Sequence, residues 1–223
     1  MSLNSESDEL TVIINHICDY LGTLVAAKGE QAAALRQQIG ELRARGLQYI
    51  KDKIFGTKLL ACFVTARTLP ITYDRVALVR LQIYNETPTG PIAIQVVETA
   101  IIDCLTTESI LITQASFASS NDAQLLMARM KTAFDAAREQ AADRMDSATY
   151  QTLTYLAGSL ANHLNATALQ LPRIVAFSFQ ASLPTLYLAN RIYQDSTRSD
   201  ELIDENNIVH PLFAPLQLNG LSA

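Results

Sequence analysis

The stretch "LPRIVAFSFQASLPTLYLANRIYQDSTRSDELIDENNIVHPLFAPLQLNGLS" (residues 171–222) decides the fold expected for the C-terminal part of the chain. Residues 174–180 alternate with a period of two and lie between two prolines, which is typical of a short strand. Two short helices are expected over 184–193 and 196–206, and a last extended piece over 212–222. The order of strand, helix, helix and strand predicts a small α+β module.

Several polar residues of this stretch suit the turns of such a module. Asp195 lies between the two short helices, where a side chain that bonds the nearby backbone stabilises a tight turn. Asn206 and Asn207 lie where the second helix must end, because asparagine tolerates the left-handed conformation. The residues expected to pack inward are Leu186, Leu188, Ala189, Ile192, Leu202, Ile203, Ile208 and Phe213.

The preceding residues, 1–170, are expected to form a body of helices. Apolar residues recur at helical spacing in successive segments, which we place at 8–27 (capped by Ser7 or Asp8), 28–49, 58–69, 74–84, 92–112, 119–145 (capped by Ser119, Ser120 or Asn121) and 147–170. The segment 74–84 has a mixed pattern that a strand would also satisfy, and we favour the helix. The segment 47–55, bracketed by two glycines, is expected to be a short helix or a turn. We place the inner face of the sixth segment at Leu125, Leu126, Met130, Phe134 and Ala137.

Domain organisation follows from these segments. The loop "NETPTGP" (residues 85–91) carries two prolines and a glycine, so it is a possible hinge within the helical body. We expect a helical body over 1–170 and a small α+β module over 171–223. The fold class is therefore mainly α, with a multi-helix body followed by a small C-terminal βααβ module.

Composition excludes several classes of function. The charged share of 17% and the net charge of -5 make nucleic acid an unlikely partner, because binding to a phosphate backbone needs clustered Lys and Arg. No apolar window is long enough for a membrane helix, and the first residues lack the pattern of a secretory signal. Cys18, Cys62 and Cys104 stand singly, without metal-ligand spacing, so they are expected to be reduced core thiols.

No group of residues in the sequence has the spacing of a catalytic site. His210 precedes Pro211 and has no Cys, Asp or second His at a workable distance, and His16 and His163 lie far from it in sequence. The acidic residues are spread over helical segments, where solvent exposure is their simplest explanation. We therefore expect a protein that is not an enzyme and that uses no cofactor and no metal.

The segment "YLANRIYQDSTRSDELIDENNIVHP" (residues 187–211) resembles the LysM-type βααβ module. In that pattern an "iA.r.Y" helix leads through a Gly-Asp turn to a second helix and an "N.i..P" exit. LysM modules bind glycan chains in many proteins, and phage tail proteins use LysM-like modules to join tail parts. This chain departs from the pattern at Gln194-Asp195, which replaces Gly-Asp, and at "PLQL", which lacks a Gly-Gln before the last strand.

A longer run carries a second resemblance. Residues 112–137 ("ITQASFASSNDAQLLMARMKTAFDAA") and residues 150–215 are similar to the C-terminal half of the DNA circularisation protein family of Mu-like phages and prophages. That family shows a Leu-rich helix ending in "LPr" and then "P.l.lAyrlY.d..R..ei...N.i.hP.f.P". Its arginine-rich N-terminal signature is absent here. The chain thus corresponds to a C-terminal part of such a protein or to a shortened relative.

The resemblance implies a structural role near the distal tail or baseplate hub. The expected partners are other tail or baseplate proteins and further copies of the same chain, with assembly in the cytoplasm of a bacterial host. The alternatives are a peptidoglycan- or glycan-binding module of the tail and, less favoured, a DNA-binding protein. For a partner or glycan site the resemblance singles out Arg191, Tyr193, Asp195, Arg198, Asn206, Asn207, His210, Pro211 and Phe213.

Overall fold

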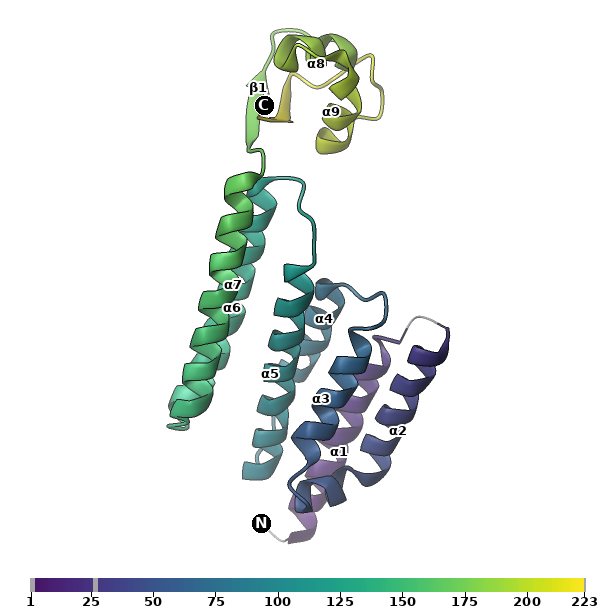
Figure 1. The fold of residues 1–223 in the computed structure, drawn as a ribbon, viewed down its shortest axis with the longest axis vertical. Coiled ribbons are helices and arrows are strands. Elements are labelled where there is room, and N and C mark those ends of the chain that lie inside the picture. The colour runs from purple at the N-terminus through teal and green to yellow at the C-terminus, as the bar shows by residue number, and fades with distance from the viewer. Residues whose placement is uncertain (1–2, 26–27, 223) are drawn as a thin grey trace. The chain divides into compact units, whose positions relative to one another are not determined.

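The structure is a computed structural model that describes residues 3–25 and 28–222. These residues form nine α-helices, one short 3-10 helix and a single pair of strands (Figure 1). The expected class, mainly α with a small C-terminal strand pair, is confirmed. The chain divides into two compact units, one of Met1–Ala115 with Met130–Leu160 and the other of Ser116–Arg129 with Ala161–Ala223.

The first unit is built around a central apolar helix. Its helices are α1 (Leu3–Gly22), α2 (Glu30–Lys51), α3 (Phe55–Ala66), α4 (Tyr73–Tyr84) and α5 (Pro91–Thr113), with parts of α6 (Ser120–Asp143) and α7 (Ser147–Gln170). Helix α5 contacts α1, α3 and α4, while α2 packs on α1 and α3. Because other helices pack against several sides of α5, its buried residues spread around most of its circumference.

The first helix begins earlier than the sequence predicted. Helix α1 starts at Leu3, so the predicted cap at Ser7 or Asp8 is wrong, and the predicted end at Ala27 lies outside the described residues. Glu9 lies within α1, and its carboxylate accepts hydrogen bonds from the N–H groups of Thr89 (2.6 Å) and Gly90 (3.0 Å). Glu9 therefore stabilises the N-terminus of α5, whose N-cap glycine has no side chain to do so.

The segments between α2 and α5 follow the predicted pattern closely. Residues 47–51 continue α2, and a turn follows in which Lys53 takes the left-handed conformation with φ 58°. The predicted helices over 58–69 and 74–84 are α3 and α4. The predicted loop at 85–91 connects α4 to α5 inside the first unit, with its last residue at the first helical position of α5, where proline is favoured.

Helix α6 begins with the predicted cap. The Ser119 hydroxyl accepts from the Asp122 N–H (3.2 Å), and the Asp122 carboxylate accepts from the Ser119 N–H (3.1 Å), as in a capping box. The predicted inner face is confirmed at Leu126, Met130, Phe134 and Ala137, which are buried. Leu125 is a correction, because it is 67% exposed. Leu126 takes the inward position, and Leu125 lies about 100° away from it around the helix, on the exposed side.

The C-terminal module has the predicted order of elements. Strand β1 pairs antiparallel with β2, and α8, a 3-10 turn and α9 lie between them in sequence. The bounds are β1 Ile174–Ser178, α8 Thr185–Tyr193, the 3-10 helix Ser196–Arg198, α9 Ser199–Asn206 and β2 Gln217–Leu221. The module has its own core, formed by Leu188, Ala189, Leu202, Ala214 and Leu218, with Phe177, Tyr193 and Ile208 packed against it.

Two residues predicted to pack inward in the module are exposed. Leu186 is 59% exposed, because it lies on the side of α8 opposite to Leu188. Phe213 is 71% exposed. Its N–H donates to the His210 carbonyl (2.9 Å) in a tight turn, and Ala214 takes the inward position instead. No helix among the described residues is both long enough and apolar enough to cross a membrane.

Candidate functional site

Tyr193 and Arg198 lie side by side on the C-terminal module, and their contacts stabilise its fold. The Arg198 guanidinium stacks 3.8 Å from the centre of the Tyr193 ring and donates two hydrogen bonds to the Glu201 carboxylate. The Tyr193 hydroxyl accepts from the N–H of Leu221 (3.0 Å), which ties α8 to β2. Burial and the nearby Glu201 carboxylate raise the pKa of Tyr193. These contacts make the pair part of the module's structure.

Asp195 and Asn207 make the turns that the sequence predicts for them. The Asp195 carboxylate accepts from the N–H (2.9 Å) and the hydroxyl (2.6 Å) of Thr197, and these bonds lower the pKa of Asp195. Asn207 ends α9 in the left-handed conformation, with φ 50°. Gln194 also takes that conformation, with φ 58°, at the position where the LysM pattern has glycine. The chain therefore keeps the turn despite its departure from the pattern.

Asn206 has a role that sequence reasoning did not assign. Its side-chain amide donates to the Asn219 carbonyl (2.7 Å) and accepts from the Asn219 N–H (2.7 Å). The amide thus bonds β2 as a neighbouring strand would. This contact covers the side of β2 that faces away from β1.

The remaining predicted residues lie elsewhere on the module. Arg191 stacks on the ring of Phe179 at 5.6 Å. The carbonyl of Pro211 accepts from the N–H of Thr185 (2.7 Å), which joins the loop after α9 to the start of α8. His210 and Phe213 are at the surface. The structure therefore does not bring the nine predicted residues into one site, and their role in binding stays a prediction.

A group of exposed apolar side chains, here called the loop patch, was missed by the sequence reasoning. The loops that precede α8 and follow α9 are joined by backbone hydrogen bonds from Thr185 to Pro211 and from Ala214 to Leu183. Between 51% and 84% of each of these side chains is exposed: Leu186, Tyr187, Val209, Leu212, Phe213 and Leu216. Their spacing in sequence resembles that of core residues, so exposure cannot be read from it.

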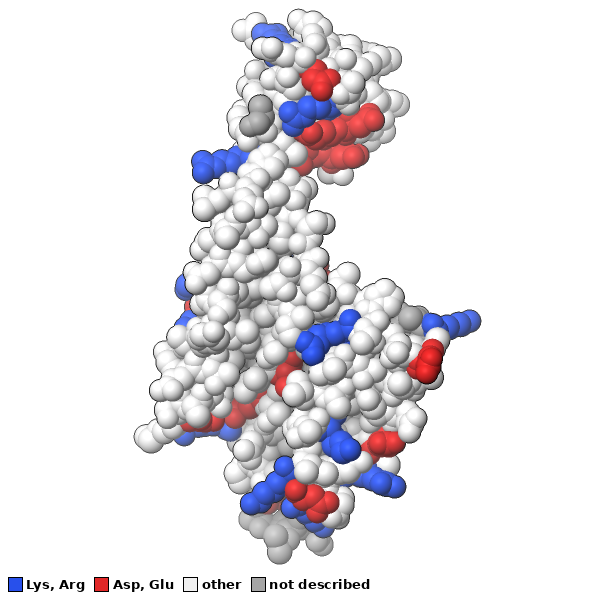
Figure 2. Space-filling view, in the orientation of Figure 1, with Lys and Arg blue, Asp and Glu red and all other residues white. Residues whose placement is uncertain are grey.

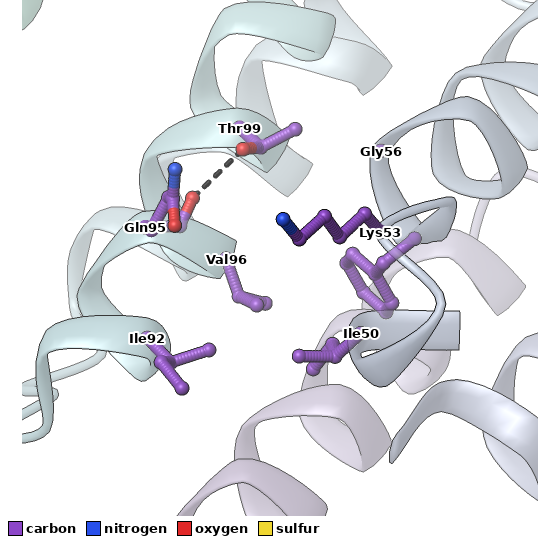
Figure 3. Close-up of a pocket in the computed structure, with 8 residues that line it drawn as sticks. Ile50, Lys53, Gly56, Ile92, Gln95, Val96 and Thr99 are labelled. Atoms are coloured by element: carbon purple, nitrogen blue, oxygen red, sulfur yellow. Dashed lines mark hydrogen bonds between the residues drawn. The ribbon is translucent and has the colours of Figure 1, made fainter. Parts of the chain in front are cut away.

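A hollow of about 450 Å³ lies in the first unit, between the end of α2, the start of α3 and the start of α5 (Figure 3). Its walls are apolar, and Gln95 and Thr99 add polar groups along α5. The Lys53 side chain extends into the hollow toward α5 (Figure 3). The apolar wall residues are Ile50, Phe55, Ile92 and Val96. One cation beside an apolar wall suits contact with another molecule and supplies no acid–base pair.

Helices α4 and α5 bury a second set of polar groups. Arg80 and Glu108 form an ion pair in which Nε lies 2.6 Å from Oε1, and the two side chains are 10% and 2% exposed. Asp103 is buried, and its Oδ2 has no hydrogen-bond partner in the part of the chain that the structure describes. Burial raises the pKa of Asp103 to about 7. These groups face the core, so we assign them to stability.

The three cysteines and His16 lie in surroundings that suit a structural role. All three cysteines are buried and unpaired, which confirms the predicted core thiols. Burial raises the pKa of Cys18 to about 11 and that of Cys62 to about 12, so both thiols are poor nucleophiles. His16 Nδ1 lies 3.0 Å from the Glu86 carboxylate. Among the described residues, no three His, Cys, Asp or Glu side chains are grouped to hold a metal ion.

No protein-family model matches the chain, and no characterised protein matches it at a significant level. The fold and its surfaces define a mainly α-helical protein with a terminal βααβ module. The resemblance to tail proteins depends on the motifs of the second half of the chain alone.

Gly220 of β2 is required by the packing of the module. A Cβ at this position would lie 2.6 Å from the Tyr193 hydroxyl and 3.1 Å from Phe177. We expect Gly220→Ala to destabilise the module by about 1–3 kcal/mol, the usual cost of overpacking. Hydrogen exchange of the β1–β2 amides measures the effect. As a control, a Cβ at Gly158 of α7 meets nothing within 4 Å, so Gly158→Ala should stabilise its helix. Equal exchange in the Gly220 variant and the wild type would contradict this account.

Proposed function

We propose that the protein is a structural component of a phage or prophage tail or baseplate that acts through protein–protein contacts. The observation that carries the proposal is the composition of α7. This helix has 24 residues and contains no Lys, Arg, Asp or Glu. Figure 2 shows the corresponding white surface along the helix. Two of its large side chains, Tyr155 and Leu169, are 79% and 82% exposed.

A surface of this kind is unusual for a helix that faces water. Exposed surfaces of folded proteins commonly carry about 25–35% charged residues, which keep them soluble and apart. Exposed apolar groups that lie close together mark protein contacts. Helix α7 and the loop patch together therefore favour a protein whose surfaces are covered by neighbours in an assembly. The resemblance of the second half to tail proteins supplies the kind of assembly.

The proposal includes the partners and the location. The neighbours are other tail or baseplate proteins and further copies of this chain, assembled in the cytoplasm of a bacterial host and carried in the virion tail. No chemical step is part of the role. The net charge of -5 stands against DNA as the partner, despite the name of the family that the chain resembles.

A charge placed on α7 tests the proposal. We expect Tyr155→Glu to weaken binding to the proteins encoded by flanking genes by about ten-fold or more, because burying an unpaired carboxylate in an interface is costly. Calorimetry with the purified partners measures the affinity, and circular dichroism confirms an intact helix. Val12→Glu is the control, since it places the same charge at a 51% exposed apolar position of α1. Unchanged binding in the Tyr155 variant would count against α7 as the interface.

Glycan binding by the module is the second candidate. A hollow of about 410 Å³ on the module is lined by Phe177, Asn206, Gln217 and Asn219, together with Ala176, Ser178 and Leu218. Aromatic rings with nearby amides are suited to sugar hydroxyls and ring faces. Titration with chito-oligosaccharides tests this candidate, and we expect Gln217→Ala to abolish any affinity found. If saturating sugar produces neither heat nor a chemical-shift change, glycan binding by the module is excluded.

A further inference from the structure

Strand β1 is an edge strand without the features that normally protect one. Its sequence, Ile174–Ser178 (IVAFS), contains no charge and no proline. Such strands present unpaired N–H and C=O groups, and proteins commonly blunt them with lysine, proline or a bulge. Figure 1 shows β1 at the outer margin of the module, with β2, α8 and α9 on its other side. The strand is therefore open to another strand.

The register of the sheet identifies the open groups. Ser222 donates to Arg173, and Phe179 donates to Leu216, so these two pairs at the ends of the ladder are hydrogen-bonded. Hydrogen-bonded and non-hydrogen-bonded pairs alternate in an antiparallel ladder. Ile174, Ala176 and Ser178 accordingly point their N–H and C=O groups away from β2.

The two outer edges of the sheet are treated differently. On β2, Asn206 bonds both backbone groups of Asn219, and the Tyr193 hydroxyl accepts from the Leu221 N–H. On β1, the Ile174 N–H donates to the Asn121 side chain at 3.2 Å. In the described part of the chain, nothing within hydrogen-bond distance meets the outward groups of Ala176 and Ser178.

We propose that β1 pairs with β1 of a second copy of this chain, antiparallel and centred on Ala176. The two sheets then join into one of four strands, in the order β2, β1, β1, β2. Each Ala176 exchanges both of its backbone hydrogen bonds with the Ala176 of the other copy. Each Ser178 N–H meets the Ile174 carbonyl of the other copy. This interface goes beyond the proposed function, because it does not depend on the protein belonging to a tail.

Three properties of the strand favour a second copy as the occupant. The outward-facing residues Ile174, Ala176 and Ser178 are spaced symmetrically about Ala176, so two copies of the strand meet in the same register. The small methyl group of Ala176 allows two strands to approach across the axis. The nearest charge, Arg173, lies opposite Phe179 of the other copy in this register, so like charges do not face each other.

A disulfide across the axis tests the register. Opposite residues in a hydrogen-bonded pair have Cα atoms about 5.5 Å apart, within the range that a disulfide spans. Under mild oxidation we expect Ala176→Cys to form a covalent dimer. Ser178→Cys is the matched control, because residues 178 of the two copies would lie roughly 13 Å apart along the strands and should not cross-link. The native thiols are buried and do not compete. Equal cross-linking of both variants, or none in Ala176→Cys, would overturn the proposal.

A proline at the same position tests the backbone contact. Ala176→Pro removes an N–H that points away from β2, so the module should keep its ladder while losing the contact between copies. Light scattering of the full chain should show a dimer for the wild type and for Ala176→Ser, and a dissociation constant raised at least about ten-fold for Ala176→Pro. Hydrogen exchange of the β2 amides confirms folding of the proline variant. A wild-type chain that stays monomeric up to the millimolar range would also overturn the proposal.

Discussion

Asp103→Asn is expected to make the protein more stable above pH 7 and to change its stability little near pH 4. The Asp103 side chain is buried in α5, and burial raises its pKa from 3.8 to about 7. The folded protein therefore holds a proton on this carboxyl in a pH range where the unfolded chain has lost it. Asparagine has nearly the same shape and carries no charge at any pH.

The sign of the pH dependence follows from this proton. Between about pH 4 and pH 7 the folded state binds more protons than the unfolded state, so the free energy of unfolding falls as the pH rises. The full effect is reached above the folded pKa. A shift of about three units corresponds to on the order of 4 kcal/mol at most. In Asp103→Asn, this decrease of the unfolding free energy with rising pH should be absent.

Urea unfolding followed by circular dichroism, from pH 4 to pH 8, measures the difference between wild type and variant. Taking the difference cancels the titration of the other groups. Asp146→Asn is a control of opposite sign, since bonds from Thr149 lower the pKa of Asp146 and its contribution is lost as the pH falls. Parallel curves for the wild type and Asp103→Asn would show that Asp103 is solvated in the folded state.

Glu108→Gln is expected to destabilise the first unit by about 3–5 kcal/mol, which is typical when one partner of a buried ion pair is removed. The Arg80 guanidinium lies against the Glu108 carboxylate between α4 and α5, with little exposure of either side chain. Glutamine keeps the shape of glutamate but leaves the buried cation without a countercharge. Thermal and urea unfolding measure the loss.

The paired variant Arg80→Met with Glu108→Leu separates charge from packing. Replacing both members of a buried pair by apolar residues is often neutral. We therefore expect this variant to recover most of the stability that Glu108→Gln loses. If the paired variant is as unstable as the single one, shape and not charge decides the contribution of these residues.

Much of the fold is predictable because helical spacing repeats over long segments. The predicted helices from 58 to 170 all appear, and α5 and α6 begin within one residue of the predicted starts at 92 and 119. The turn residues Asp195 and Asn207 are also predictable, because their side chains act on the backbone within a few positions. Structural features that depend on residues close together in the chain can therefore be predicted from a single sequence.

Contacts between distant positions are not predictable in this way. Glu9 looks like a residue of a first helical turn, and only the fold brings it to Gly90. Asn206 looks like a helix terminator, and its contact with Asn219 depends on how α9 meets β2. Leu125 and Phe213 are large apolar residues of the kind that usually fill a core, but their neighbours Leu126 and Ala214 take the buried positions. The candidate surfaces were missed for the same reason, since exposure is a property of the packed chain.

The amide of Asn206 has a consequence for the size of any assembly. A small sheet with two free edges can add strands without end, and fibres form in that way. Here the Asn206 side chain and the Tyr193 hydroxyl bond the outward backbone groups of β2, so growth can proceed from the other edge alone. Association through this sheet must therefore close after a single step.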